Sequence, residues 1–349
     1  MNRLVLLLAA LNSVYIVPAT GKAQDNEKPK SDVPASISAE AQTFLLNRPA
    51  ISEVIPTTLE QWQSEREKRE VLGKKLYEAC PKKYAGKATI LTFRNAEGHS
   101  VHVHKMSPQT LKAKNKALIH IHGGGFCFMS PESTCFVCAP LADATGLCVY
   151  CVDYRLAPEH PFPAGLDDCV TAYRGIVNEV CPDNLGIFGE SAGGSLSLTM
   201  LLKARDEGLP MPAALACISP ATDLTVSGDS FRTLDGLDPV LTRAKARAFR
   251  AAYAGNANLR QPLLSPLFAK YSRSFPPTII QTGTRDLLLS DCVQLHEKMK
   301  AAGVNVELSV REGMWHGYHV LPNSEFPEAK AGFAELAEFF CRELRLRSN

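Results

Sequence analysis

From residue 117 onward, short apolar runs alternate with longer segments whose apolar residues recur at helical spacing. The apolar runs have the length of buried strands, and the amphipathic segments have the length of helices. The expected strands cover residues 117–122, 147–152, 184–188, 213–218, 277–281 and 305–310, and the expected helices cover residues 164–180, 191–205, 242–253, 291–302 and 326–346. This alternation predicts an α/β fold with a mostly parallel sheet that is covered by helices on both faces.

The segment before residue 117 follows other patterns. Residues 38–79 have helical character and carry Trp62, followed by a charged run at 64–70 that is typical of a solvated helix face. Residues 87–93 and 100–105 alternate or carry β-branched side chains on either side of a turn. They predict an antiparallel pair of strands.

The first 23 residues have the order charged, apolar, small. Arg3 supplies the charge, residues 4–18 are mostly apolar, and Gly21 and Ala23 place small residues before a cleavage point. This order predicts a signal peptide cleaved near Ala23, so the mature chain is expected to be exported, either periplasmic or secreted. The apolar run is shorter than the roughly 20 residues of a membrane span, and an uncleaved N-terminal anchor is the alternative.

The length and composition of the chain indicate a globular protein and bound the number of its domains. The chain has 349 residues, 45% hydrophobic and 21% charged, which excludes collagen-like, disordered and coiled-coil chains. After the signal peptide at 1–23, residues 24–86 are expected to hold a linker and N-terminal cap helices. Residues 87–349 are expected to form one catalytic domain with a cap insertion at about 222–262. The formal charge is +2 without a basic cluster, so no nucleic-acid partner is expected.

The cysteines number 11, so at least one thiol stays outside any disulfide. Cys135 and Cys138, and Cys148 and Cys151, have the spacing of two zinc knuckles. The gap between the pairs is short and the second pair lies in a strand-like run, so the pattern does not favour zinc. Most of the cysteines have apolar neighbours and are expected to be small core residues, and no metal site is predicted.

The segment Gly189-Glu190-Ser191-Ala192-Gly193 fits the G-x-S-x-G pattern between an expected strand and an expected helix. A sharp strand-to-helix turn needs glycines beside the serine, because the strained serine backbone crowds its neighbours. The turn lifts the Ser191 hydroxyl onto a helix N-terminus, where developing negative charge is favoured. The pattern predicts that Ser191 is a nucleophile.

A second glycine-rich segment, His122-Gly123-Gly124-Gly125-Phe126, follows another expected strand. Glycines let backbone N–H groups point into a cleft without obstruction by side chains. Such donors stabilise the oxyanion of acyl transfer, and HGGG-type motifs serve this purpose in esterases. The expected oxyanion hole comprises Gly123, Gly124, Gly125 and Ala192, with Gly124 and Gly125 preferred within the loop.

The partners of the serine are expected in the order acid, then histidine. Asp286 follows the expected strand 277–281, and His316 follows the strand 305–310, so both lie at carboxyl ends of strands. These positions predict a Ser191-His316-Asp286 triad. Asp291 is the rival acid but begins an expected helix, where it suits an N-cap. His319 is the rival base.

Other histidines occur in pairs. His102 and His104 share a strand face, as do His120 and His122. Such pairs can bind metal, but no carboxylate or further histidine nearby in the sequence completes a ligand set. His122 is expected instead to hold the glycine loop through hydrogen bonds.

Several motifs in order resemble the hormone-sensitive-lipase-like bacterial esterase branch of the α/β-hydrolases. They are His122-Gly123-Gly124-Gly125-Phe126, Asp153-Tyr154-Arg155-Leu156-Ala157-Pro158-Glu159-His160, Gly189-Glu190-Ser191-Ala192-Gly193-Gly194, Ser265-Pro266-Leu267 and Gly283-Thr284-Arg285-Asp286. The resemblance covers about residues 40–345 and implies the α/β-hydrolase fold with a helical cap, expected from about 35–75 and 222–262. Glu190 stands where the family commonly has Asp or Thr.

The resemblance and the triad together imply a serine carboxylesterase for short- to medium-chain esters, acting through an acyl-enzyme without cofactor or metal. The expected partner is a small-molecule ester, and the chain is expected to be a monomer or homodimer. A lactonase, deacetylase or amidase with the same triad is the alternative. A catalytically silent binding protein on this fold is another, against which the intact triad argues.

Overall fold

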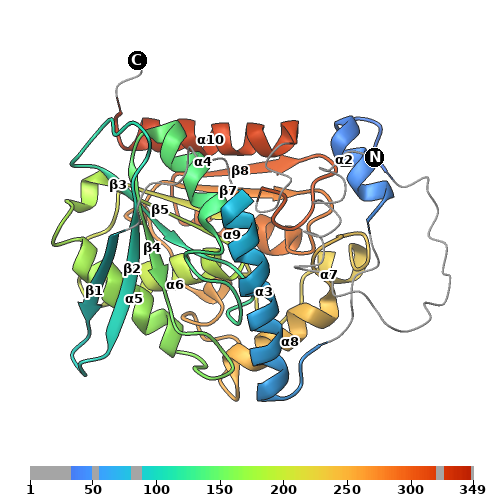
Figure 1. Cartoon of the computed structure of the whole chain (residues 1–349), viewed down its shortest axis with the longest axis horizontal. Helices are drawn as coiled ribbons and strands as arrows, with labels where there is room; N and C mark the ends of the chain where they lie inside the picture. The colour runs from blue at the N-terminus through green and yellow to red at the C-terminus, as the bar shows by residue number, and fades with distance from the viewer. Residues whose placement is uncertain (1–32, 49–54, 80–88, 320–325, 347–349) are drawn as a thin grey trace.

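The structure of the chain is a computed structural model, and it describes residues 33–48, 55–79, 89–319 and 326–346. For residues 72–79 it describes the backbone only. The predicted signal peptide and the predicted boundary at residues 86–87 lie outside the described residues. Figure 1 shows a central sheet with helices on both sides.

The core of the molecule is an eight-stranded sheet with the order β1-β2-β4-β3-β5-β6-β7-β8. The strands are β1 (Thr89–Arg94), β2 (Ser100–Met106), β3 (Ala117–Ile121), β4 (Cys148–Asp153), β5 (Leu185–Glu190), β6 (Ala214–Ile218), β7 (Thr278–Gly283) and β8 (Val306–Arg311). Strand β2 pairs antiparallel with both β1 and β4, and all other pairs are parallel. The predicted mostly parallel sheet and the predicted antiparallel pair at its edge are therefore confirmed.

Helices cover both faces of this sheet, as the apolar character of its central strands requires. On one face lie α5 (Ala164–Ile176), α6 (Ala192–Asp206) and α9 (Leu289–Ala301), packed on side chains such as Ile119, Ile187 and Ile280. On the other face lie α4 (Cys135–Thr145) and α10 (Pro327–Glu343), packed on side chains such as Leu118 and Phe188. Each buried strand thus sends alternate residues into two separate cores.

Helix α4 was not predicted from the sequence. It contains Pro140, which removes a backbone donor and usually interrupts a helix. Burial compensates for the proline, because Val137, Cys138 and Leu141 pack between the sheet and α10. The region 38–79 also forms two helices rather than one stretch, α2 (Ala39–Leu46) and α3 (Leu59–Ala79).

The inserted segment 222–262 contains α7 (Ser230–Thr233) and α8 (Arg243–Ala254). In Figure 1 α8 lies beside the lower half of α3, although the two are far apart in sequence. Their contact is aromatic: the Trp62 ring on α3 lies 6.2 Å from the Phe249 ring on α8 and 5.4 Å from the Phe128 ring. Trp62 is only 5% exposed, so its burial joins the N-terminal helix to the insertion.

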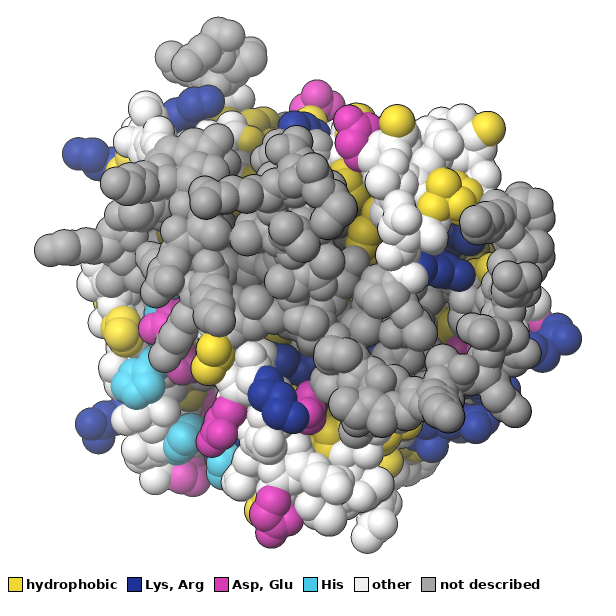
Figure 2. All heavy atoms as spheres, turned by 45° about the vertical axis from the view of Figure 1, so that its right-hand side comes forward, with side chains coloured by type: hydrophobic (Ala, Val, Ile, Leu, Met, Phe, Trp, Pro, Cys, Tyr) yellow, Lys and Arg dark blue, Asp and Glu magenta, His cyan; other side chains and the backbone are white. Residues whose placement is uncertain are grey.

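Charged and hydrophobic side chains are mixed on the described part of one face of the molecule. Figure 2 shows acidic and basic side chains lying among one another, with the described hydrophobic side chains in small separate groups. Among the described residues, no helix combines the length and the apolar character that a membrane crossing requires.

Candidate active site

Ser191 occupies the sharp turn between β5 and α6, with backbone angles φ 55° and ψ −118°. This is a strained conformation for a residue with a side chain. Hydrogen bonds hold it, because the Ser191 N–H donates to the Ile218 carbonyl at 2.8 Å. At Gly193 a Cβ atom would lie 1.9 Å from the Ile121 carbonyl oxygen, which explains why this turn needs glycine after the serine.

The structure brings Ser191, His316 and Asp286 into one hydrogen-bonded chain. His316 Nε2 lies 2.9 Å from Ser191 Oγ, and His316 Nδ1 lies 3.1 Å from Asp286 Oδ1. Asp286 is fully buried and also accepts hydrogen bonds from the Thr282 hydroxyl and the Leu288 N–H. Each of the three residues stands just after a strand, so the carboxyl ends of β5, β7 and β8 position them.

The rival residues lie elsewhere. His319 is buried, and neither ring nitrogen has a hydrogen-bond partner within the described residues. Burial lowers the pKa of His319 to about 3, so it is neutral. Asp291 does not cap a helix, because α9 begins at Leu289; its Oδ2 instead accepts the N–H groups of Thr222 and Asp223. The N-cap prediction for Asp291 was wrong, since the carboxylate holds the start of the insertion to α9.

Charge within the triad favours an ion pair. Burial opposes protonation of His316, but the Asp286 carboxylate outweighs it and raises the pKa of His316 above the ordinary histidine value. Burial alone would raise the pKa of Asp286. The charge of His316 and its hydrogen bond to Asp286 lower the pKa by more, so the net shift is downward. A positive charge that develops on His316 is thus stabilised by a carboxylate that stays ionised.

The glycine loop presents backbone donors beside Ser191. Gly124 and Gly125 have φ values of +101° and +62°, a region that side chains rarely adopt. Within the described residues, the N–H groups of Gly124, Gly125 and Ala192 donate to no protein acceptor. Gly123 departs from the expectation for an oxyanion donor, because its N–H donates to Glu190 Oε1 at 2.8 Å.

Glu190 connects the loop to a buried histidine. Its second oxygen, Oε2, lies 2.7 Å from His120 Nε2, so a carboxylate does stand beside His120, contrary to the expectation from sequence. That expectation missed the contact because β3 and β5 pair in space while residues 120 and 190 are far apart in sequence. His122 does contact the loop, with Nδ1 2.9 Å from the Gly123 carbonyl, and burial lowers its pKa to about 4.

Two apolar pockets meet at Ser191. The first encloses about 670 Å³ of empty space, counting its open mouth, and its walls include Gly124, Phe128, Phe249 and His316. The second encloses about 420 Å³ and its walls include Ala192 and Phe249. Both contain Ser191 and Gly125 in their walls. Ser191 therefore lies where two apolar pockets adjoin.

Two supporting residues were missed by sequence reasoning. Asp238, in the insertion, is buried and accepts the N–H groups of Leu287 and His316 through Oδ2. It thereby ties the insertion to the loops that carry the acid and the base. Its only signal in the sequence is the Asp-Pro step before α8.

Arg66 on α3 is the second missed residue. Its guanidinium donates to the carbonyls of Cys127 and Ala157 and forms a two-pronged ion pair with Glu159. These contacts fasten α3 to the segment that follows the glycine loop. The charged run 64–70 is therefore only partly a solvated face.

Comparison with known proteins agrees with this geometry. A family model described as alpha/beta hydrolase fold matches residues 118–320. An acetyl-hydrolase from Streptomyces hygroscopicus is 36% identical over 212 residues, which are 59% of this chain and 71% of that protein. The match spans the strands and loops that carry the site, so the chain belongs to the α/β-hydrolase family.

Similar solved structures indicate which branch of the α/β-hydrolase family the chain resembles. An esterase from the bacterial hormone-sensitive lipase family superposes with a TM-score of 0.75 at 29% identity, covering 87% of this chain and 97% of the other. EstE5, in crystals soaked with p-nitrophenyl butyrate, superposes with a TM-score of 0.72 at 32% identity, covering 84% and 94%. The resemblance to the hormone-sensitive-lipase-like branch is therefore confirmed.

Proposed function

We propose that this protein is a serine carboxylesterase that hydrolyses short- to medium-chain esters through an acyl-enzyme. The observation that carries the proposal is the chain of hydrogen bonds from Ser191 through His316 to Asp286, set between two apolar pockets. The names of its relatives, which include acetyl-hydrolase and esterase, point to the same reaction.

The geometry suggests how each group acts. His316 Nε2 takes the hydroxyl proton as Ser191 Oγ attacks the ester carbonyl, and Asp286 stabilises the imidazolium that forms. The N–H groups of Gly124, Gly125 and Ala192 then stabilise the oxyanion, helped by the positive end of α6. His316 passes the proton to the leaving alcohol, and a water repeats the sequence to release the acid.

The cap belongs to the same proposal. Helix α3 and the insertion with α8 lie over the glycine loop and supply Trp62 and Phe249 to its apolar surroundings. A substrate must fit beneath these side chains, which favours small soluble esters over a lipid surface.

Hydrolysis of p-nitrophenyl butyrate by the native protein and by Ser191→Ala tests the proposal. The variant removes only a hydroxyl, so it is expected to fold, to lose nearly all turnover and to lose covalent labelling by an organophosphonate. Ser195→Ala is the matched control, because that serine lies one turn further along α6 and is buried away from the pockets. Labelling that persists in Ser191→Ala would place the nucleophile elsewhere.

A panel of lactones, acetylated sugars and anilides separates this activity from its alternatives. A carboxylesterase is expected to favour the simple alkyl esters by a wide margin. A higher kcat/KM for any of the other classes would replace the proposed substrate class while leaving the triad in place.

A further inference from the structure

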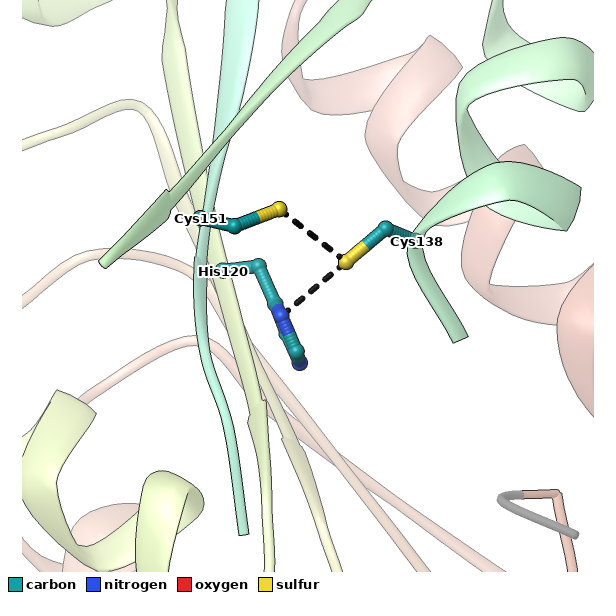
Figure 3. A group of neighbouring side chains, drawn as sticks. All are labelled: His120, Cys138 and Cys151. Atoms are coloured by element: carbon teal, nitrogen blue, oxygen red, sulfur yellow. Dashed lines mark hydrogen bonds between the residues drawn. The ribbon is translucent and has the colours of Figure 1, made fainter. Parts of the chain in front are cut away.

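Three side chains with metal-binding atoms converge behind the nucleophile turn. They come from three elements: His120 from β3, Cys151 from β4 and Cys138 from α4 (Figure 3). Cys138 Sγ lies 3.0 Å from His120 Nδ1 and 3.3 Å from Cys151 Sγ, and all three ligand atoms lie within 4.8 Å of one another. None of the three is more than 1% exposed.

The orientation of His120 matches that of a metal-bound histidine. Its Nε2 faces Glu190 Oε2 at 2.7 Å, and a carboxylate accepts a hydrogen bond, so Nε2 carries the proton. When the ring is neutral, Nδ1 directs a lone pair toward Cys138 Sγ. A carboxylate on the far nitrogen of the ring is the usual outer partner of a histidine ligand, because it fixes the tautomer and strengthens the donor.

When both cysteines bind a cation as thiolates, charge balance favours a divalent ion over a monovalent one. Two thiolates carry two negative charges that burial would strongly disfavour without compensation. A divalent cation bound by two thiolates and a neutral imidazole gives a site of zero net charge, whereas a monovalent cation leaves a net charge of minus one. Glu190 keeps its own charge satisfied through His120 Nε2 and the Gly123 N–H.

We propose that His120, Cys138 and Cys151 bind a structural Zn²⁺ ion on the side of the sheet covered by α4. Cysteine sulfur and histidine nitrogen are the ligands that zinc prefers, and a structural site takes four of them. Tetrahedral zinc separates sulfur ligands by about 3.8 Å, so binding moves the two sulfurs apart by about half an ångström. His104, the register partner of Cys151 on β2, faces the same side of the sheet and is the candidate fourth ligand.

Binding is an exchange of protons for the cation. The two thiols lose their protons to solvent as the sulfur–zinc bonds form, so affinity falls at acidic pH. The ion would join β3, β4 and α4 beneath the Glu190–Gly123 contact, and so support the loop that carries Gly124 and Gly125. The inference does not depend on the proposed ester hydrolysis, because its readout is the metal itself.

The test measures zinc in the purified protein. Protein reduced, equilibrated with ZnCl₂ and passed through a desalting column is expected to retain one Zn²⁺ per chain by elemental analysis. Cys138→Ala and Cys151→Ala are each expected to lose at least nine-tenths of it. Cys169→Ala is the matched control, since this cysteine is equally buried but lies on α5, on the other face of the sheet, and it is expected to retain the full amount.

Cobalt provides a second readout that needs no variant of the cluster. In a Cys181→Ala background, which removes the one exposed thiol among the described residues, Co²⁺ is expected to give a thiolate-to-cobalt charge-transfer band. Absence of that band would overturn the proposal even if the cluster variants failed to fold. Equal zinc retention in the folded Cys138→Ala and Cys151→Ala variants would also overturn it. So would a Cys138–Cys151 disulfide in the protein as purified, seen as a mass lower by two hydrogen atoms, if the same protein retains no zinc after it is reduced.

Discussion

At the scale of single residues, the glycine loop leaves no room for a side chain at Gly124. A Cβ atom at Gly124 would lie 2.4 Å from the Phe128 carbonyl oxygen, so Gly124→Ala must displace the backbone. Because the Gly124 N–H is a proposed oxyanion donor, we expect kcat to fall by about 10²–10³ with little change in KM.

Gly208 provides the matched control for this substitution. It also has a positive φ, +74°, but no atom lies within 4 Å of its Cβ position. Gly208→Ala is expected to cost about 1 kcal/mol of stability and no activity. Equal losses of kcat in both variants, measured on p-nitrophenyl butyrate, would show that the effect at Gly124 is one of folding.

His316 determines the acid side of the pH profile. The base must be neutral to accept the serine proton, and Asp286 raises the pKa of His316 above its ordinary value. The protonated, inactive form therefore persists to higher pH, and kcat/KM is expected to rise with a midpoint above about 6.5. Asp286→Asn removes the negative charge that raises the pKa of His316, so the midpoint of the profile is expected to move to lower pH. The same substitution is expected to lower kcat by about 10⁴. A midpoint that stays in place in Asp286→Asn would assign the titration to another group.

At the scale of elements, α8 supplies a wall to both pockets at Ser191. Phe249 forms part of both pockets at Ser191 and packs edge-on against Phe128, with ring centroids 5.8 Å apart. We propose that this ring limits the depth available to an acyl chain. For the native protein we expect kcat/KM to rise from acetyl to butyryl or hexanoyl esters and to fall by dodecanoyl, without a jump when substrate forms micelles.

Phe249→Ala is expected to join the two pockets and move the maximum to longer chains. Each additional CH₂ adds about 0.8 kcal/mol of binding where the pocket has room for it. The measurement is kcat/KM across p-nitrophenyl esters below their aggregation limits. Val293→Ala, at an exposed position on α9, is the control and is expected to leave the maximum unchanged. A maximum at palmitoyl in the native protein would refute the shallow pocket.

At the scale of the whole molecule, we propose that residues 1–23 direct export. The order charged, apolar, small predicts removal of this segment, so the natural protein is expected to begin at Gln24. N-terminal sequencing of protein from the producing cell measures this directly. Leu7→Arg interrupts the apolar run and is expected to leave the full-length chain inside the cell. Native protein that begins at Met1 would contradict the proposal.

The sequence determined the features that depend on local pattern. Strand and helix order follow from hydrophobic periodicity, and the structure confirms the six strands expected between residues 117 and 310. Loops at carboxyl ends of parallel strands meet at one edge of the sheet, so motif order predicted that Ser191, Asp286 and His316 would converge, as they do. The two glycine motifs could be recognised in the sequence because positive φ values and close backbone contacts require glycine at those positions.

Only the tertiary structure decided the contacts between distant segments. Helix α4 forms despite Pro140 because burial against the sheet outweighs its local propensity. Asp238 reaches the His316 N–H only once the insertion has folded back over the sheet. Cys138 and Cys151 belong to pairs whose sequence spacing argued against zinc, yet sheet register and helix packing bring them to His120. Such contacts depend on which faces meet in space, and no local pattern of residues encodes that.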